Sequence, residues 1–206
     1  MVGLGNPGQR YARTRHNVGF RVADALAQTW GLPGWRGAFG GHAQDARPTR
    51  GGVERRVVLL KPHTFMNCSG QAVKGLAAFY KSDPSELLIV LDDMALPLGR
   101  LRMRASGSAG GHNGLADVLR HLGTDEVPRL RVGVGAPALE TDAADFVLSP
   151  FEADESSIVE RAVAQAARAV EDWVFNGAAY VMDRYNRKPD DQEVETCRSN
   201  NNGSQR

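Results

Sequence analysis

His16 and Asp92 are the two residues of this sequence best suited to acid–base chemistry. Asp92 directly follows the apolar run 87–91, which is typical of a strand buried on both faces. A carboxylate at the end of such a strand is desolvated, so it can orient an imidazole and raise its basicity. The pair therefore indicates a general base with a supporting acid. A lone histidine is commonly structural, so that alternative stays open. An Asp-Asp strand end can also bind metal in nucleotide hydrolases, but the chain has no GxxxxGK(S/T) loop to support that interpretation.

Two asparagines lie where their amides could reach a substrate. Asn6 belongs to the turn Asn6-Pro7-Gly8, directly after a strand predicted at residues 1–5. Sheets of α/β proteins bind ligands at the carboxyl ends of their strands. Asn67 lies just before a predicted helix, so its side chain could cap that helix or donate to a site. The residues alone leave the structural and the functional role open for both.

Two glycine-rich segments could bind an anion. Residues 107–114 include His112 and Asn113 and precede a helix, so converging backbone N–H groups and the helix dipole suit a developing oxyanion. Residues 3–8 satisfy the GxGxxG pattern of dinucleotide-binding proteins. That pattern requires a helix to start at once and an acidic residue to close a second strand. Here the next helix is predicted near Phe20, and Asp24 lies inside it, so a dinucleotide site is not expected.

Arginines gather on two predicted strands. The segment 100–104 alternates strictly, which places its three arginines on one face, and Arg129 and Arg131 belong to another strand. Phosphate binding is the functional interpretation, and a solvated edge strand is the structural one. The net charge of +1 conceals an uneven distribution, because residues 1–104 carry 15 Lys/Arg and 7 Asp/Glu, whereas residues 105–206 carry 10 and 17. Such polarity lets one face attract a polyanion.

Strand-like and helix-like segments alternate along the chain, which predicts an α/β fold with helices packed on a sheet. Strands are predicted at residues 1–5, 57–60, 87–91, 100–104 and 130–134, and helices at 20–30, 73–80, 115–122 and 159–176. Residues 34–52 are predicted to be a surface excursion. One domain is expected over residues 1–186, followed by a polar, disordered tail at 187–206.

Composition and missing motifs exclude several classes of protein. The 206 residues are 42% apolar and 24% charged, which is typical of a soluble globular domain. No run of about 18 apolar residues and no secretion signal is present, so neither a membrane protein nor a secreted one is expected. Two cysteines cannot form a disulfide framework, which indicates a reduced, intracellular setting. The sequence contains no HExxH, CxxC or GxSxG motif, so zinc and serine enzymes are not expected.

Five motifs in a fixed order resemble bacterial-type peptidyl-tRNA hydrolase over residues 2–186: GLGNPG, TRHNVG, TFMNxSG, the strand-ending Asp-Asp and GSAGGHNGL. The resemblance implies a cytoplasmic, monomeric α/β protein with a twisted mixed sheet flanked by helices. It implies hydrolysis of the ester between a peptide and the 3′-terminal ribose of tRNA, recycling tRNA from abortive translation without a metal or other cofactor. The partner is then peptidyl-tRNA, bound at its acceptor end.

The resemblance also implies a role for each residue that matches a family motif. It implies that His16 is the general base for water, that Asp92 orients it, and that Asn6 and Asn67 belong to the catalytic set. The residues it implies for substrate binding are Tyr11, Phe65, Met66, Asn67, His112 and Asn113, and those it implies for tRNA binding are Arg102, Arg104 and Arg131.

The sequence departs from the family pattern at two places, and two other functions stay open. Members usually have several more residues before the first strand, and an acidic residue two positions after the Asp-Asp pair, where this chain has Ala95. One alternative is a non-enzymatic RNA-binding module, since the fold resembles a plant intron-splicing factor. The other is a nucleotide-dependent oxidoreductase, which depends on GxGxxG alone.

Overall fold

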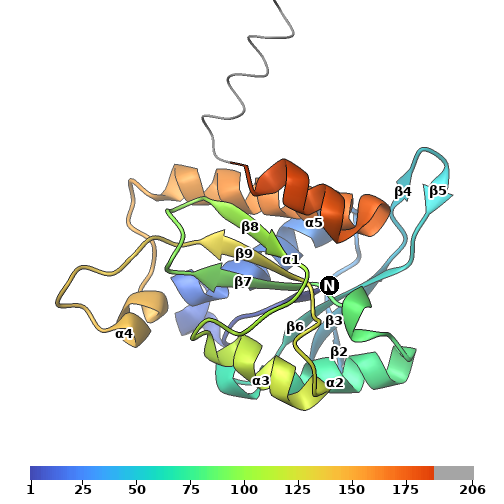
Figure 1. The fold of residues 1–206 in the computed structure, drawn as a ribbon, viewed down its shortest axis with the longest axis horizontal. Coiled ribbons are helices and arrows are strands. Elements are labelled where there is room, and N and C mark those ends of the chain that lie inside the picture. The colour runs from blue at the N-terminus through green and yellow to red at the C-terminus, as the bar shows by residue number, and fades with distance from the viewer. Residues whose placement is uncertain (188–206) are drawn as a thin grey trace, which may run out of the picture.

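Buried apolar runs of the sequence become the central strands of a mixed sheet in the computed structural model, which describes residues 1–187. Seven strands form this sheet in the order β2-β3-β6-β1-β7-β9-β8 (Figure 1). Their bounds are Val2–Gly3 (β1), Arg36–Ala38 (β2), Gly41–Ala46 (β3), Val57–Pro62 (β6), Ile89–Asp93 (β7), Leu101–Arg104 (β8) and Arg129–Gly133 (β9). A separate hairpin pairs Thr49–Arg50 (β4) with Val53–Glu54 (β5).

Strand direction brings the polar ends of the central strands to one edge of the sheet. β1 pairs in parallel with β6 and β7, and β7 pairs in parallel with β9. β3 and β8 run antiparallel to β6 and β9 and extend the sheet on its two sides. The carboxyl ends of β1, β6, β7 and β9 therefore lie along the same edge, where α/β proteins bind their ligands.

Helices cover both faces of the sheet (Figure 1). On one face, α1 and α5 bury Val22, Leu26, Val163 and Val170 against the sheet, and on the other, α2 and α3 form a second apolar cluster with it. The bounds are Val18–Thr29 (α1), Ser69–Tyr80 (α2), Asn113–Leu122 (α3), Ala143–Leu148 (α4) and Ser156–Tyr185 (α5), with short 3-10 turns at Gln9–Tyr11 (η1), Arg15–Asn17 (η2), Met66–Cys68 (η3) and Pro84–Glu86 (η4).

The structure confirms the predicted sheet flanked by helices and corrects the prediction in two places. Residues 34–52 are not a surface excursion, because β2 and β3 add two strands to the sheet there. The apolar side chains that β3 buries are small, Ala43 and Ala46, and it also buries the polar Gln44, so it lacks the apolar alternation of an ordinary strand. The helix predicted to end at Gly177 bends there instead, since Gly177 has φ 80° and α5 continues to Tyr185.

Two further predictions concern the chain as a whole. Within residues 1–187, no helix is long and apolar enough to cross a membrane. The polar tail was predicted to begin at residue 187, and residues 188–206 lie outside the described part of the chain. The predicted disorder of the tail therefore stays a prediction.

Candidate active site

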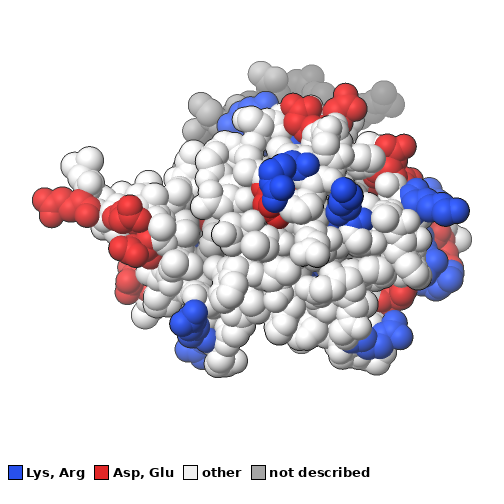
Figure 2. Space-filling view, turned by 90° about the horizontal axis from the view of Figure 1, so that it is seen from below, with Lys and Arg blue, Asp and Glu red and all other residues white. Residues whose placement is uncertain are grey.

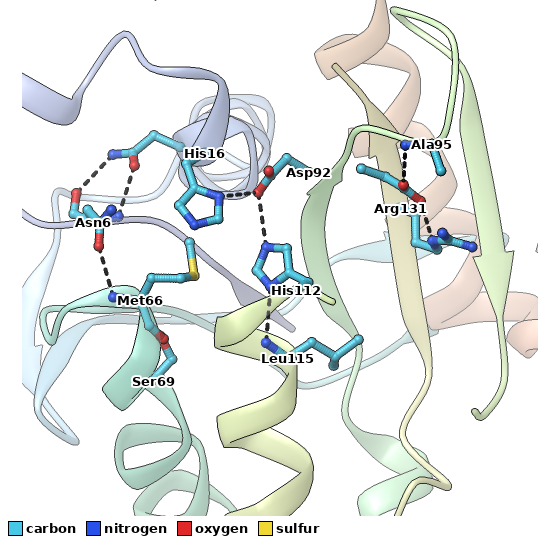
Figure 3. Close-up of polar contacts among 11 residues, drawn as sticks. Asn6, His16, Met66, Ser69, Asp92, Ala95, His112, Leu115 and Arg131 are labelled. Atoms are coloured by element: carbon cyan, nitrogen blue, oxygen red, sulfur yellow. Dashed lines mark hydrogen bonds and ion pairs between the residues drawn. The ribbon is translucent and has the colours of Figure 1, made fainter. Parts of the chain in front are cut away.

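His16 and His112 both contact one oxygen of Asp92 (Figure 3). His16 Nδ1 lies 2.8 Å from Asp92 Oδ1, and His112 Nε2 lies 3.1 Å from the same atom. Asp92 is the second-to-last residue of β7 and is only 3% exposed, as the apolar run before it predicted. The expected His16–Asp92 pair is therefore present, and a second histidine joins it.

The partners of each imidazole determine which nitrogen carries a proton. The backbone N–H of Leu115 donates to His112 Nδ1 at 3.1 Å, so that nitrogen accepts and Nε2–H donates to Asp92. His16 directs Nδ1 toward the same carboxylate, which accepts only, so Nδ1 is the donor there too. This leaves His16 Nε2 with a free lone pair, which is what a general base requires.

Asp92 remains ionised in this environment. Burial on its own would raise the pKa of Asp92, but the hydrogen bonds and electrostatic interactions with His112, followed by those with His16, hold the pKa well below its usual range. A carboxylate at this position can fix the tautomer of His16 and balance the positive charge that His16 gains when it takes a proton.

Asn6 is held in place by Asn17 and by Met66. The backbone N–H of Asn6 donates to Asn17 Oδ1 at 2.8 Å, and Asn17 Nδ2 donates back to the carbonyl of Asn6 at 2.9 Å. The side-chain oxygen of Asn6 accepts from the backbone N–H of Met66 at 2.8 Å (Figure 3). Asn6 Nδ2 has no partner among the described residues, so it is free to donate to a substrate.

The turn that carries Asn67 is fixed from two sides. On one side, Asn6 binds the preceding residue, Met66, as described above. On the other side, the buried carboxylate of Asp117 in α3 accepts from the backbone N–H of Gly70 at 2.7 Å. Asn67 itself is exposed and does not cap α2 through a backbone hydrogen bond, so its amide is available to a ligand.

The glycine-rich segment 107–114 leads into α3, as predicted. Gly107, Gly110 and Gly111 have φ values of 121°, 56° and 83°, which favour glycine over any other residue. His112 is the N-cap of α3, and Asn113 is the first residue of the helix, with its side chain exposed. The loop thus presents Asn113 beside the His112–Asp92 contact.

Four arginines of β8 and β9 lie on one face of the sheet. In the antiparallel register, Arg102 lies opposite Arg131, and Arg104 lies opposite Arg129. Arg129 is 2% exposed and donates to the carbonyls of Gly107 and Asp125, so it holds the glycine-rich loop. Arg131 pairs with Asp93, which also accepts from the backbone N–H of Ala95 at 2.9 Å (Figure 3). Arg102 and Arg104 are exposed.

These groups surround a cavity of about 1250 Å³. Most of the predicted site residues line it, whereas Tyr11 and Arg102 are not among the lining residues; those that line it are Asn6, His16, Phe65, Met66, Asn67, Asp92, Arg104, His112, Asn113 and Arg131. Figure 2 shows acidic side chains gathered at one end of the molecule. Three exposed acidic residues lie in or just before α4: Glu140, Asp142 and Asp145. The cavity therefore has arginines on its β8–β9 side and carboxylates beside its α4 side.

A metal ion and a dinucleotide are the two other ligands that the sequence raises for this site. The ligand atoms of His16, Asp92 and His112 lie within 4.8 Å of one another, which is close enough to hold a metal ion. Such an ion would have to replace both hydrogen bonds to Asp92.

The glycines of the GxGxxG pattern do not form a dinucleotide site. After Gly8 the chain enters the 3-10 turn η1, and α1 begins only at Val18, so the helix that such a site requires does not follow these glycines.

Sequence reasoning missed three contacts of the site. Asn17 holds Asn6, Asp117 holds Gly70, and His112 binds Asp92. Asn17 and His112 lie within motifs that were recognised, so their position was a usable signal. Asp117 gave none, because a carboxylate on a helix is ordinarily exposed to solvent.

Comparisons with known proteins point to one family. The family model described as peptidyl-tRNA hydrolase matches residues 1–193. The chain is 48% identical to a peptidyl-tRNA hydrolase of Synechococcus sp. over 90% of this chain and 81% of the relative, and 48% identical to one of Chloroflexus aggregans over 90% and 97%. The crystal structure of peptidyl-tRNA hydrolase from Acinetobacter baumannii superposes with a TM-score of 0.81 at 35% identity, covering 90% of this chain and 92% of that one.

Proposed function

The chain belongs to the peptidyl-tRNA hydrolase family, and we propose that His16 is the general base of its reaction, the hydrolysis of the ester between a peptide and the 3′-terminal ribose of tRNA. The observation that carries this proposal is the contact of His16 Nδ1 with Asp92, which leaves Nε2 free in a residue that lines the cavity. His16 Nε2 takes a proton from water while the water oxygen attacks the ester carbonyl. A positioned general base of this kind contributes a factor of about 10²–10⁴ in rate.

The tetrahedral intermediate then needs hydrogen-bond donors for its oxyanion. The amides of Asn67, Asn6 and Asn113 line the cavity, and each donor aimed at the oxyanion is worth roughly 3 kcal/mol. When the intermediate collapses, the bond from carbon to the ribose oxygen breaks, and the imidazolium of His16 returns its proton to that oxygen. The products are a peptide with a free carboxylate and a tRNA with a free 3′-terminal hydroxyl.

Recognition of the two halves of the substrate is divided between polar amides and arginines. Amides that bind the peptide backbone do not distinguish between side chains, which suits an enzyme that must accept every peptide. The ester is common to all substrates, so preference for tRNA has to come from Arg102, Arg104 and Arg131, which share one face of the sheet. Phe65 and Met66 supply apolar surface to the cavity, whereas Tyr11 does not line it, so a role of Tyr11 in substrate binding rests on the family resemblance alone.

We also propose that the chain acts as a monomer in the cytoplasm. Every group named above belongs to one chain, so no second copy is required to complete the site. Peptidyl-tRNA arises where translation occurs, and an enzyme that recycles it must have access to that compartment.

The experiment that tests the mechanism is release of peptide from N-blocked aminoacyl-tRNA by the wild type and by His16→Ala. We expect kcat to fall by about 10²–10⁴ with little change in KM. His63→Ala is the matched control, because His63 is exposed and does not line the cavity. The assay is repeated with EDTA, which should leave the rate unchanged. Full activity of His16→Ala would refute the mechanism, and loss of activity in EDTA would assign the His16–Asp92–His112 cluster to a metal ion.

A further inference from the structure

Helix α4 forms one wall of the active-site cavity. Four of its residues line the cavity and are called the α4 wall from here on: Ala143, Ala144, Val147 and Leu148. The helix has six residues, which is too short to be stable in water without support. Contacts with the rest of the protein must therefore set the position of this wall.

Arg15 binds both ends of the segment that contains α4. Its Nη1 donates to the carbonyl of Val134 at 2.9 Å and to Glu155 Oε1 at 3.1 Å, and its Nη2 donates to Glu155 Oε2 at 2.6 Å. Val134 comes directly after β9, and Glu155 comes directly before α5, so the two lie on either side of the α4 segment. One guanidinium thus ties the two ends of that segment together.

The same side chain also contacts the inside of the segment. The guanidinium carbon of Arg15 lies 4.4 Å from the ring centroid of Phe146 and 4.8 Å from that of Phe151. The backbone N–H of Arg15 donates to the carbonyl of Ser149 at 3.0 Å. Arg15 is only 4% exposed, so its guanidinium is buried against the segment whose two ends it binds.

We propose that Arg15 is a positioning residue that holds the α4 wall at a fixed place beside His16, the next residue along the chain. This inference rests on the proposed function of the cavity. His16 is held separately by Asp92, so loss of the Arg15 contacts releases the wall and leaves the base in place. The carboxylates of Glu140, Asp142 and Asp145 repel phosphates from this side, so the apolar wall is assigned to the peptide part of the substrate.

Kinetics of Arg15→Ala separate this role from a catalytic one. If the α4 wall of Arg15→Ala occupies its wild-type position only about a tenth of the time, KM for peptidyl-tRNA rises about tenfold, while kcat stays within about twofold of the wild type. Guanidinium ion added to Arg15→Ala should restore KM. Glu155→Gln keeps Arg15 and removes its charged partner, so it should raise KM less and in the same direction. Arg21→Ala is the matched control, because the guanidinium carbon of Arg21 also lies near Phe151, 5.8 Å from its ring centroid, and Arg21 does not line the cavity.

Hydrogen exchange supplies a readout that does not depend on substrate. Amides of residues 136–150 should exchange faster in Arg15→Ala and Glu155→Gln, while those of α2 stay unchanged. A fall in kcat with KM unchanged, or unchanged exchange in 136–150, would overturn the proposal. If Arg15→Ala does not fold, Glu155→Gln alone decides by the same two criteria. An inactive wild type would count against the proposed function, whereas the exchange result would still decide the role of Arg15.

Discussion

His16 and His112 share a single oxygen of Asp92, and their ring centroids lie 5.0 Å apart. Because the Leu115 N–H occupies Nδ1 of His112, that imidazole is neutral and donates through Nε2. The one negative charge of Asp92 is therefore available to the one positive charge that His16 acquires during the reaction. Had both rings been protonated, two cations at this distance would compete for a single counterion.

Replacing His112 with alanine tests this division of roles. Asp92 would lose one of its two donors, so it would hold His16 less firmly, and the loss of a hydrogen bond to a charged group corresponds to about a tenfold fall in kcat. The decrease should be clearly smaller than that of His16→Ala in the same hydrolysis assay. His63→Ala again serves as the control. Equal losses in the two variants would mean that His112 is itself an essential acid or base.

Arg102 and Arg104 offer a comparison within one strand. Both are exposed on the same face of β8, but only Arg104 lines the cavity. If both bind phosphates, Arg102→Ala and Arg104→Ala each raise KM for full-length substrate and each lower the slope of log KM against log salt by about one. Neither should affect a minimal substrate that carries only the 3′-terminal nucleotide ester. Similar losses on both substrates would contradict the tRNA-binding role.

Two glycines of α2 are expected to respond to alanine in opposite directions. A Cβ at Gly70 would lie 2.3 Å from the backbone oxygen of Asp117, so Gly70→Ala must separate α2 from α3 and should cost about 1–3 kcal/mol of unfolding free energy. A Cβ at Gly75 meets nothing within 4 Å, so Gly75→Ala should stabilise by about 0.4–1 kcal/mol. Urea unfolding measures both. Equal effects would show that the close approach at Gly70 does not constrain the helix pair.

Sequence alone predicted much of the site because parallel strands place their carboxyl ends together. Asn6 and Asp92 were expected at such ends, and both line the cavity. The buried run before Asp92 also predicted its burial correctly. These inferences needed only local pattern and the general geometry of α/β sheets.

Contacts between residues far apart in the chain could not be predicted from the local sequence pattern. Arg15 binds Glu155 across 140 residues, and Asn6 binds Met66 across 60. Neither contact follows from periodicity, since each depends on the strand order and on how loops pack. The short helix α4 was also missed, because six residues of mixed polarity carry no distinct helical period.

Acid should weaken the Arg15–Glu155 pair. Burial alone would raise the pKa of Glu155, but hydrogen bonds from Arg15 and from the Glu152 N–H, together with the charge of Arg15, lower it. The stabilisation is therefore present above the unfolded pKa, about 4.3, and is lost as pH falls through the lower folded value. At pH 7, Glu155→Gln should cost about 1 kcal/mol, because Glu155 is partly exposed and water screens the pair, and this difference from the wild type should shrink steadily below pH 4.

Urea unfolding across this pH range measures the effect. Glu126→Gln provides the control, because the Glu126 side chain is exposed. A difference between wild type and Glu155→Gln that stays constant down to pH 2 would mean that ionisation of Glu155 does not stabilise the segment.

Asn6 has two roles: its Oδ1 accepts from the Met66 N–H, and its Nδ2 is available to donate to a substrate. Two substitutions distinguish these roles. Asn6→Asp keeps an oxygen that can accept from the Met66 N–H, but it replaces Nδ2 with a second acceptor. Its thermal stability should therefore stay close to that of the wild type. Asn6→Ala leaves the Met66 N–H without its partner, which should cost about 1–3 kcal/mol.

Both Asn6 variants lose the amide donor, so kcat should fall about 10²-fold in each. Thermal unfolding and the hydrolysis assay, run on the same preparations, separate the two roles, and Asn176→Asp is the control for an added carboxylate at an exposed position. Wild-type activity of Asn6→Asp would remove Nδ2 from the set of oxyanion donors and leave Asn67 and Asn113. Wild-type stability of Asn6→Ala would show that Met66, and the turn carrying Asn67, are held by Asp117 through Gly70 without help from Asn6.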